Sequence, residues 1–150
     1  MRKRAQVSTE YLVILAVVLV IALVVVYLIS QSTGLGAGTL ETQSQAYWRA
    51  VQPLATIGFK ASTTTLSLEV ISNAQDVITL TKITGSGLTD YTTSTIFSPG
   101  QTRTIAITLN TSCGTVGTRY TYSNLTFTYT SGGILAKTFV GQRPLVGSCS

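Results

Sequence analysis

Few side chains in this sequence could carry out acid–base or metal chemistry. Only five of the 150 residues are acidic, and histidine, the commonest general base and metal ligand, is absent. Four of the acids, Glu41, Glu69, Asp76 and Asp90, are dispersed along the chain. The two cysteines cannot complete a four-ligand zinc site by themselves. We therefore expect no enzymatic activity, no catalytic residues, no metal and no cofactor.

The fifth acid, Glu10, stands directly before a long apolar run. Residues 11–29 carry no formal charge, and as an α-helix they would extend about 28 Å, close to the hydrocarbon thickness of a bilayer. Leu, Val, Ile and Ala occupy every face of that helix, so it must be surrounded by lipid or by other apolar helices. The basic residues Arg2, Lys3 and Arg4 orient it with the N-terminus in the cytoplasm and the later residues outside.

This basic trio supplies most of the positive charge. The net charge of +5 falls to +2 without it, and the other seven basic residues are scattered singly along the chain. No cluster remains that could follow a phosphate backbone, so we expect no nucleic-acid partner.

Three interpretations of the N-terminal segment compete. A secretory signal peptide would have a shorter apolar stretch and a small-residue cleavage site after it. A plain membrane anchor explains the length and the basic flank, but not the polar hexapeptide Gln-Val-Ser-Thr-Glu-Tyr at positions 6–11. This hexapeptide resembles the Q-x-S-x-E-Y signature of archaeal type IV pilins, which carry class III signal peptides. The resemblance implies that a prepilin peptidase cleaves between Ala5 and Gln6 and that the apolar segment stays on the mature protein.

Glu10 then has two interpretations. It is either an acid favoured by the dipole at a helix start, with Ser8 as the N-cap, or the partner of an amine on another subunit. The second follows from the resemblance to type IV pilins, in which Glu10 of one subunit would pair with the α-amino group of Gln6 of its neighbour. An unpaired charge among apolar helices costs several kcal/mol, so pairing would select the stagger between subunits.

The remaining sequence predicts a short linking region and a β-rich head. Alternate glycines at 34, 36 and 38 predict a bend or a melted stretch, and a short helix is expected over 39–51, with Tyr47, Trp48, Val51 and Leu54 packing on the head. Period-2 patterns and turn residues predict strands at 64–71, 77–84 and 103–109, a Pro-Gly turn at 98–101, and a hairpin of 119–130 with 134–140. The apolar residues fall at even positions in 120–122 and at odd positions in 125–129, and this change predicts a bulge near 123–124.

The predicted fold class is therefore α+β: a long N-terminal apolar helix followed by an all-β, Ig-like sandwich head. The predicted divisions are a cleaved basic leader at 1–5, an apolar transmembrane and polymerisation helix at 6–30, a Gly-rich hinge with a short helix at 31–60, and the head at 61–150. The second half of the chain resembles the Ig-like heads of archaeal pilins and archaellins.

Two further pairs of residues are candidate sites of covalent chemistry. Cys113 and Cys149 are the only cysteines, and an exported chain favours a disulfide between them, with free thiols as the alternative. Asn110-Thr111-Ser112 and Asn124-Leu125-Thr126 both match the N-glycosylation pattern. Neither sequon is preferred from sequence alone.

The resemblance to archaeal type IV pilins thus implies a structural pilin of an archaeal type IV pilus-like filament. We expect such a filament to serve surface adhesion, with twitching and DNA uptake as the other functions that a whole filament could have. The partners implied are other copies of the chain in a helical homopolymer, a prepilin peptidase, a pilus assembly ATPase with its membrane platform, and the membrane before assembly. The protein would begin as a membrane-inserted precursor and end in an extracellular filament. The alternatives are an anchored extracellular binding module that never polymerises, an archaellin-type subunit, and a minor, tip or priming pilin.

Overall fold

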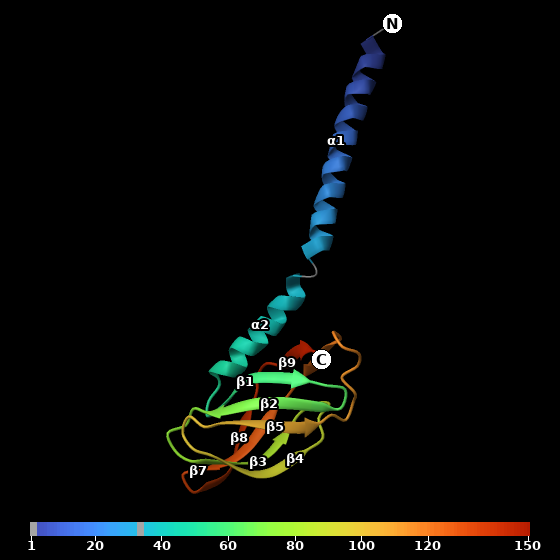
Figure 1. The fold of residues 1–150 in the computed structure, drawn as a ribbon. Helices are drawn as coiled ribbons and strands as arrows, with labels where there is room; N and C mark the ends of the chain where they lie inside the picture. Colours follow the sequence, from blue (N-terminus) through green and yellow to red (C-terminus); the bar gives the residue numbers. More distant parts are fainter. Residues whose placement is uncertain (1–2, 33–34) are drawn as a thin grey trace. The chain divides into compact units, whose positions relative to one another are not determined.

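The computed structural model describes residues 3–32 and 35–150, with the side chains of residues 9–29 and 38–150. The chain divides into two compact units, Met1–Thr39 and Leu40–Ser150, which we describe separately. The first contains helix α1, Lys3–Ser32, and the start of helix α2, Leu35–Ala50 (Figure 1). The second contains the rest of α2 and nine strands.

Helix α1 is continuous over the predicted apolar segment. Its many Val and Ile residues have modest helix propensity in water, but a chain in lipid must satisfy its backbone hydrogen bonds internally, which a helix does. Ser8 and Glu10 lie inside α1, which begins at Lys3 in the unprocessed chain. The expectation that Ser8 caps the helix concerns the processed chain and stays a prediction.

Helix α2 is longer than the short helix predicted over 39–51. It begins at Leu35 and includes Gly36 and Gly38, so these glycines do not interrupt the helix as expected. The third glycine of the expected bend, Gly34, lies outside the described residues. Pro53 follows soon after the end of α2 at Ala50, as the restriction on the residue before proline predicts.

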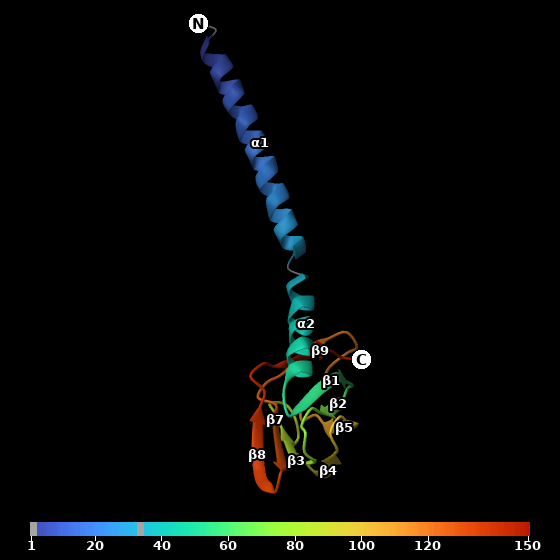
Figure 2. The same cartoon turned by 90° about the vertical axis from the view of Figure 1, so that its left-hand side faces the viewer.

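The strands of the second unit form two antiparallel sheets and a short ribbon. The bounds are β1 Leu54–Ala61, β2 Thr65–Ser72, β3 Ile78–Thr84, β4 Tyr91–Phe97, β5 Thr102–Thr108, β6 Arg119–Tyr122, β7 Thr126–Ser131, β8 Ile134–Val140 and β9 Leu145–Ser148. One sheet has the order β1-β2-β5, the other β4-β3-β7-β8, and β6 pairs with β9. Figure 2 shows the two sheets as two layers.

This strand order confirms the α+β fold class and the sandwich head. If β1, β2 and β5 are named A, B and E, then β4, β3, β7 and β8 correspond to C′, C, F and G of an Ig-like sandwich. The inward faces of both sheets contribute to a single apolar cluster, whose fully buried members include Leu66, Leu68, Ile78, Leu80 and Phe127. The alternation of apolar and polar residues in β2 and β3 produces this core directly.

Helix α2 belongs to the head by its contacts. Trp48 is completely buried, and its ring meets those of Phe127 in β7 and Phe139 in β8 edge to face, at centroid distances of 6.3 and 6.4 Å. The Arg49 side chain donates a hydrogen bond to the carbonyl of Ile57 in β1 at 3.1 Å. The helix therefore contacts strands of both sheets, and the predicted core role of Trp48 is confirmed.

The head also begins earlier than the predicted residue 61. Strand β1 starts at Leu54 and ends at Ala61, so the predicted boundary falls on its last residue. Residues 123–124 also differ from the prediction of a bulge within one strand. Strand β6 pairs with β9 and β7 pairs with β3 and β8, so the chain passes from one sheet to another there, and Asn124 adopts a φ of 55°.

Candidate functional site

The first candidate site is the outer surface of helix α1. Thr9–Ile29 contains an 18-residue window with a mean hydropathy of 3.6, and it is long and apolar enough to cross a membrane. Every one of these side chains is exposed, and the large apolar ones range from 46% at Val25 to 66% at Tyr11, so no described side chain of the first unit buries this surface. An exposed apolar surface of this size requires lipid or other protein around it.

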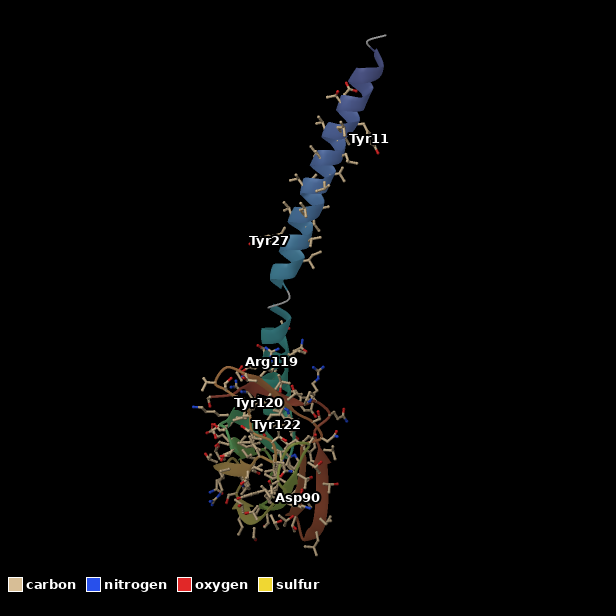
Figure 3. All side chains as sticks on the ribbon, turned by 90° about the vertical axis from the view of Figure 1, so that its right-hand side faces the viewer. Tyr11, Tyr27, Asp90, Arg119, Tyr120 and Tyr122 are labelled. Atoms are coloured by element: carbon tan, nitrogen blue, oxygen red, sulfur yellow. A yellow bond between two sulfur atoms is a disulfide. The ribbon has the colours of Figure 1, made fainter. Side chains whose placement is uncertain are left out.

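Tyr11 and Tyr27 lie toward the two ends of this apolar segment (Figure 3). Sixteen residues separate them, which corresponds to about 24 Å along a helix axis. Tyrosine favours the level of the lipid headgroups, where its ring is apolar and its hydroxyl is wet. Glu10 is adjacent to Tyr11, so in a membrane-inserted chain it would lie near the aqueous boundary.

Two shallow grooves follow one side of α1. The first is lined by Thr9, Glu10, Val13 and Ile14, and the second by Ala16, Val17, Val20 and Ile21. These residues recur at spacings of three and four, which is the spacing of the ridges and grooves through which helices pack together. Glu10 lines the N-terminal groove, so a helix packed there would lie against its carboxylate.

The predicted cleavage site lies in the helical backbone of α1. Ala5 and Gln6 both fall within Lys3–Ser32, while their side chains are outside those described. A peptidase that cuts between them must act where the chain is helical in this form. The Glu10 side chain, one turn further along α1, is exposed.

The predicted disulfide is present. Cys113 and Cys149 are bonded, with Cα atoms 5.9 Å apart and a sequence separation of 36 residues. Main-chain hydrogen bonds extend this link: the Cys149 N–H donates to the carbonyl of Thr118 at 2.7 Å, and the Cys113 N–H to that of Thr63 at 3.0 Å. The C-terminal strand is thereby fixed to the body of the head on both sides of the bond.

The two sequons have different surroundings. Asn110 uses both ends of its amide: Nδ2 donates to the Leu88 carbonyl at 2.8 Å, and Oδ1 accepts from Thr89 Oγ1 at 2.8 Å. Asn124 lies exposed in the connection between β6 and β7. Its main-chain carbonyl accepts a hydrogen bond from Thr126 Oγ1 at 3.0 Å.

Within the part of the chain that the structure describes, no group of three or more His, Cys, Asp or Glu side chains could hold a metal ion. Lys82 and Asp90 form a surface ion pair at 2.7 Å, a kind of contact that contributes at most about 1 kcal/mol.

A pair of tyrosines in β6 has altered acidity. Tyr120 and Tyr122 are stacked, with ring centroids 5.1 Å apart (Figure 3). Burial raises the pKa of Tyr120 well above its ordinary value of 10.0, and the neighbouring Tyr122 and Glu41 raise it further. Burial also raises the pKa of Tyr122. Both hydroxyls therefore hold their protons to a higher pH than a free tyrosine does.

Sequence reasoning missed two residues that connect α2 with the end of the chain. The buried Ser44 hydroxyl donates to the Pro144 carbonyl at 2.9 Å and accepts from the Val146 N–H at 3.0 Å. A Cβ atom at Gly141 would lie 2.1 Å from Cη2 of Trp48, so only glycine fits beside this ring. Neither residue carries a local signal, because both contacts join positions nearly a hundred residues apart in sequence.

Comparison with known proteins assigns the N-terminal segment. Residues 3–29 match the family model of the class III signal peptide. Neither a curated protein nor a solved structure matches the chain. The segment with its basic flank, polar hexapeptide and apolar helix is thus a class III signal peptide. It indicates a type IV pilin-like or archaellin-like precursor, which implies processing by a prepilin peptidase and a pilus-type assembly system. Together with α1, it fits a membrane-inserted, secreted precursor.

Proposed function

We propose that the protein is a structural subunit of an archaeal type IV pilus-like extracellular filament that serves surface adhesion. The observation that carries this proposal is the uncovered apolar helix α1, which coincides with the class III signal peptide at residues 3–29. A segment retained after processing must exchange lipid for another apolar environment when it leaves the membrane. Other copies of the same helix provide one.

Processing supplies the charge that this assembly needs. Cleavage between Ala5 and Gln6 removes the basic residues at positions 2–4 and creates an α-amino group on Gln6. We propose that this amine pairs with Glu10 of a neighbouring copy. Leaving Glu10 unpaired among packed apolar helices would cost several kcal/mol, so the paired stagger is strongly preferred. The position of Glu10 in a groove of α1 supports this role, since a packed helix there would lie against the carboxylate.

The free energy of assembly depends on packing more than on burial from water. Lipid tails are already apolar, so moving α1 from bilayer to helical bundle yields mainly van der Waals contact and ion pairing. The ridges and grooves along Thr9–Ile21 suit such packing. The sandwich heads would remain outside the bundle, where their surfaces are available for adhesion.

The small number of acidic residues and the absence of histidine support a subunit without enzymatic activity. Two alternatives of other kinds share the same helix and head. An anchored binding module would remain in the membrane, and an archaellin-type subunit would assemble into a rotating filament. Adhesion would be a function of the whole filament, not of a single subunit.

Shearing of the producing cells tests the proposal against the anchored module. Surface structures released by shear are sedimented, and the protein is detected in this fraction and in washed membranes with an antibody to the head. We expect most of the protein in sedimentable filaments of uniform diameter. Recovery only from membranes would contradict assembly, and filaments that support swimming but not attachment would favour the archaellin-type alternative.

The Glu10→Gln substitution tests the pairing itself. Glutamine keeps the size and hydrogen-bonding capacity of the side chain but removes the charge, so we expect processed protein to accumulate in the membrane with few filaments. Glu69→Gln is the matched control, because Glu69 is an exposed acid of the head strand β2. Normal filament numbers with Glu10→Gln would show that the pairing is wrong while leaving the filament assignment intact.

A further inference from the structure

We propose that the folded head carries an N-linked oligosaccharide on Asn124 and none on Asn110. The inference rests on the export of the head that the proposed function includes. It goes beyond that function by assigning one modification site where the sequence offers two equivalent ones. The argument depends on what each asparagine amide does in the folded protein.

Asn110 is part of the structure that fixes the neighbouring loop. Its Nδ2 lies 2.8 Å from the Leu88 carbonyl, and its Oδ1 lies 2.8 Å from Thr89 Oγ1. Its main-chain N–H donates to the Gly87 carbonyl at 3.0 Å. Residues 87–89 are thus held at three points by one asparagine. A sugar attached to Nδ2 replaces one of its two hydrogens and would have to fit beside the Leu88 carbonyl that this nitrogen contacts.

The rest of the first sequon is also engaged. Ser112 Oγ accepts a hydrogen bond from the Gly114 N–H at 3.3 Å, next to the disulfide-bonded Cys113. Leu109 forms an isolated antiparallel bridge with Leu88, and both are buried. The first sequon therefore has hydrogen bonds on the side chains of both Asn110 and Ser112 and lies beside the disulfide.

Asn124 differs from Asn110 in its amide contacts. Both asparagine side chains are exposed, but among residues 38–150 no hydrogen bond to the Asn124 amide is found. Its φ of 55° lies in the left-handed region that asparagine tolerates better than most residues. An oligosaccharide attached here displaces no contact of the head.

The main chain on both sides of Asn124 is nevertheless well held. The Ser123 carbonyl accepts from the Ser86 N–H at 2.9 Å, and the Leu125 carbonyl accepts from the Gly141 N–H at 2.8 Å. The sequon hydroxyl, Thr126 Oγ1, donates to the Asn124 carbonyl at 3.0 Å. The acceptor amide thus belongs to a connection whose neighbouring main chain is hydrogen-bonded, with the threonine of its sequon bonded to its own carbonyl.

The group transferred is an oligosaccharide activated as a lipid-linked phosphate or diphosphate ester. Nδ2 of Asn124 attacks the anomeric carbon, a C–N bond forms, and the C–O bond to the phosphate breaks. The leaving phosphate takes the bonding electron pair, and one Nδ2 proton passes to a base of the transferase. No oxidation or reduction occurs.

Mass spectrometry of the full-length protein from its producing cells tests this assignment. Intact mass and glycopeptides are compared for the wild type, Asn124→Asp and Thr126→Val, which each destroy the second sequon, and Asn110→Asp and Ser112→Ala, which each destroy the first. We expect one glycan, absent from the first two variants and retained in full by the last two. We also expect Asn110→Asp to lower Tm, because it replaces the amide donor to Leu88, and Asn124→Asp to leave Tm nearly unchanged in deglycosylated protein.

Two results would overturn the assignment: a glycan on the peptide containing Asn110, or a chain whose mass shows no glycan at either sequon. Ser112→Ala keeps Asn110 and its contacts, so it remains informative even if Asn110→Asp folds poorly. The test of glycosylation can fail independently of the test of assembly. Filaments without glycan would contradict glycosylation of Asn124 but leave the filament proposal intact. A glycosylated chain found only in membranes would contradict assembly but leave the glycosylation proposal intact.

Discussion

Truncation of Trp48 to alanine tests whether helix α2 is a structural part of the head. The ring is completely buried and contacts aromatic rings of both β7 and β8. Loss of a buried tryptophan side chain typically costs about 3–5 kcal/mol, because burial is lost and a cavity remains. In a head of this size, such a loss lowers Tm by about 10–20 °C.

The assay is thermal and urea unfolding of the full-length protein in detergent micelles, followed by the circular dichroism of the β-strands. Leu40→Ala is the matched control, since Leu40 also lies in α2 but is 54% exposed. We expect a change below about 1 kcal/mol for the control. Equal effects of the two substitutions would refute the conclusion that α2 completes the core, as would a Trp48→Ala protein as stable as the wild type.

Three further substitutions follow from the head's packing, its disulfide and its buried tyrosine. Gly141→Ala should destabilise the head by about 1–3 kcal/mol in urea unfolding, because its Cβ would overlap Trp48, whereas Gly38→Ala, with nothing within 4 Å, should not. Replacement of Cys113 and Cys149 by alanine should cost about 4 kcal/mol on the chain-entropy model, and a Tm that does not change on reduction of the wild type would contradict this. The raised pKa of Tyr120 means that the folded head binds its proton more tightly than the unfolded chain does, so stability is full below pH 10 and falls as the pH rises further. Tyr120→Phe should flatten this alkaline loss, as measured by Tm against pH.

The N-terminal helix and several strands could be predicted because their signals are local. The apolar segment is continuous, and Leu66, Leu68 and Val70 alternate with polar residues as a half-buried strand requires. The turn at 98–101 also forms as its Pro-Gly pair predicts, with Gly100 at a φ of 74° and the Gln101 N–H donating to the Ser98 carbonyl at 2.9 Å.

The elements that sequence reasoning missed have weak or misleading patterns. Strand β1 begins with three consecutive buried residues and contains a register shift between Thr56 and Gly58, so it shows no regular alternation. In β4 only Phe97 is buried; Tyr91 is half-buried, Ile96 is exposed and Ser and Thr lie between them, so the strand shows no clear apolar face. The sequence does show that the alternation of apolar residues changes near residue 124. The passage of the chain from one sheet to another at this point cannot be predicted locally, because β6 pairs with the distant strand β9.

The candidate sites divide in the same way. The polar hexapeptide at 6–11 and the two sequons are sequence motifs, so they could be found without a structure. The difference between Asn110 and Asn124 could not, because the contacts of Asn110 with residues 88 and 89 come from a loop about twenty residues earlier. The contacts of Ser44 with residues 144 and 146 likewise exist only once the chain has folded.

The N-terminal residue of the protein in sheared, sedimented filaments tests the central claim most directly. Edman degradation or N-terminal peptide mass spectrometry of this material should find Gln6 as the first residue, with the whole apolar helix retained. A chain that begins at Met1 and is found only in membranes would contradict the account. A chain that begins beyond Ile29 would contradict it as well, since the helix proposed to assemble would have been removed.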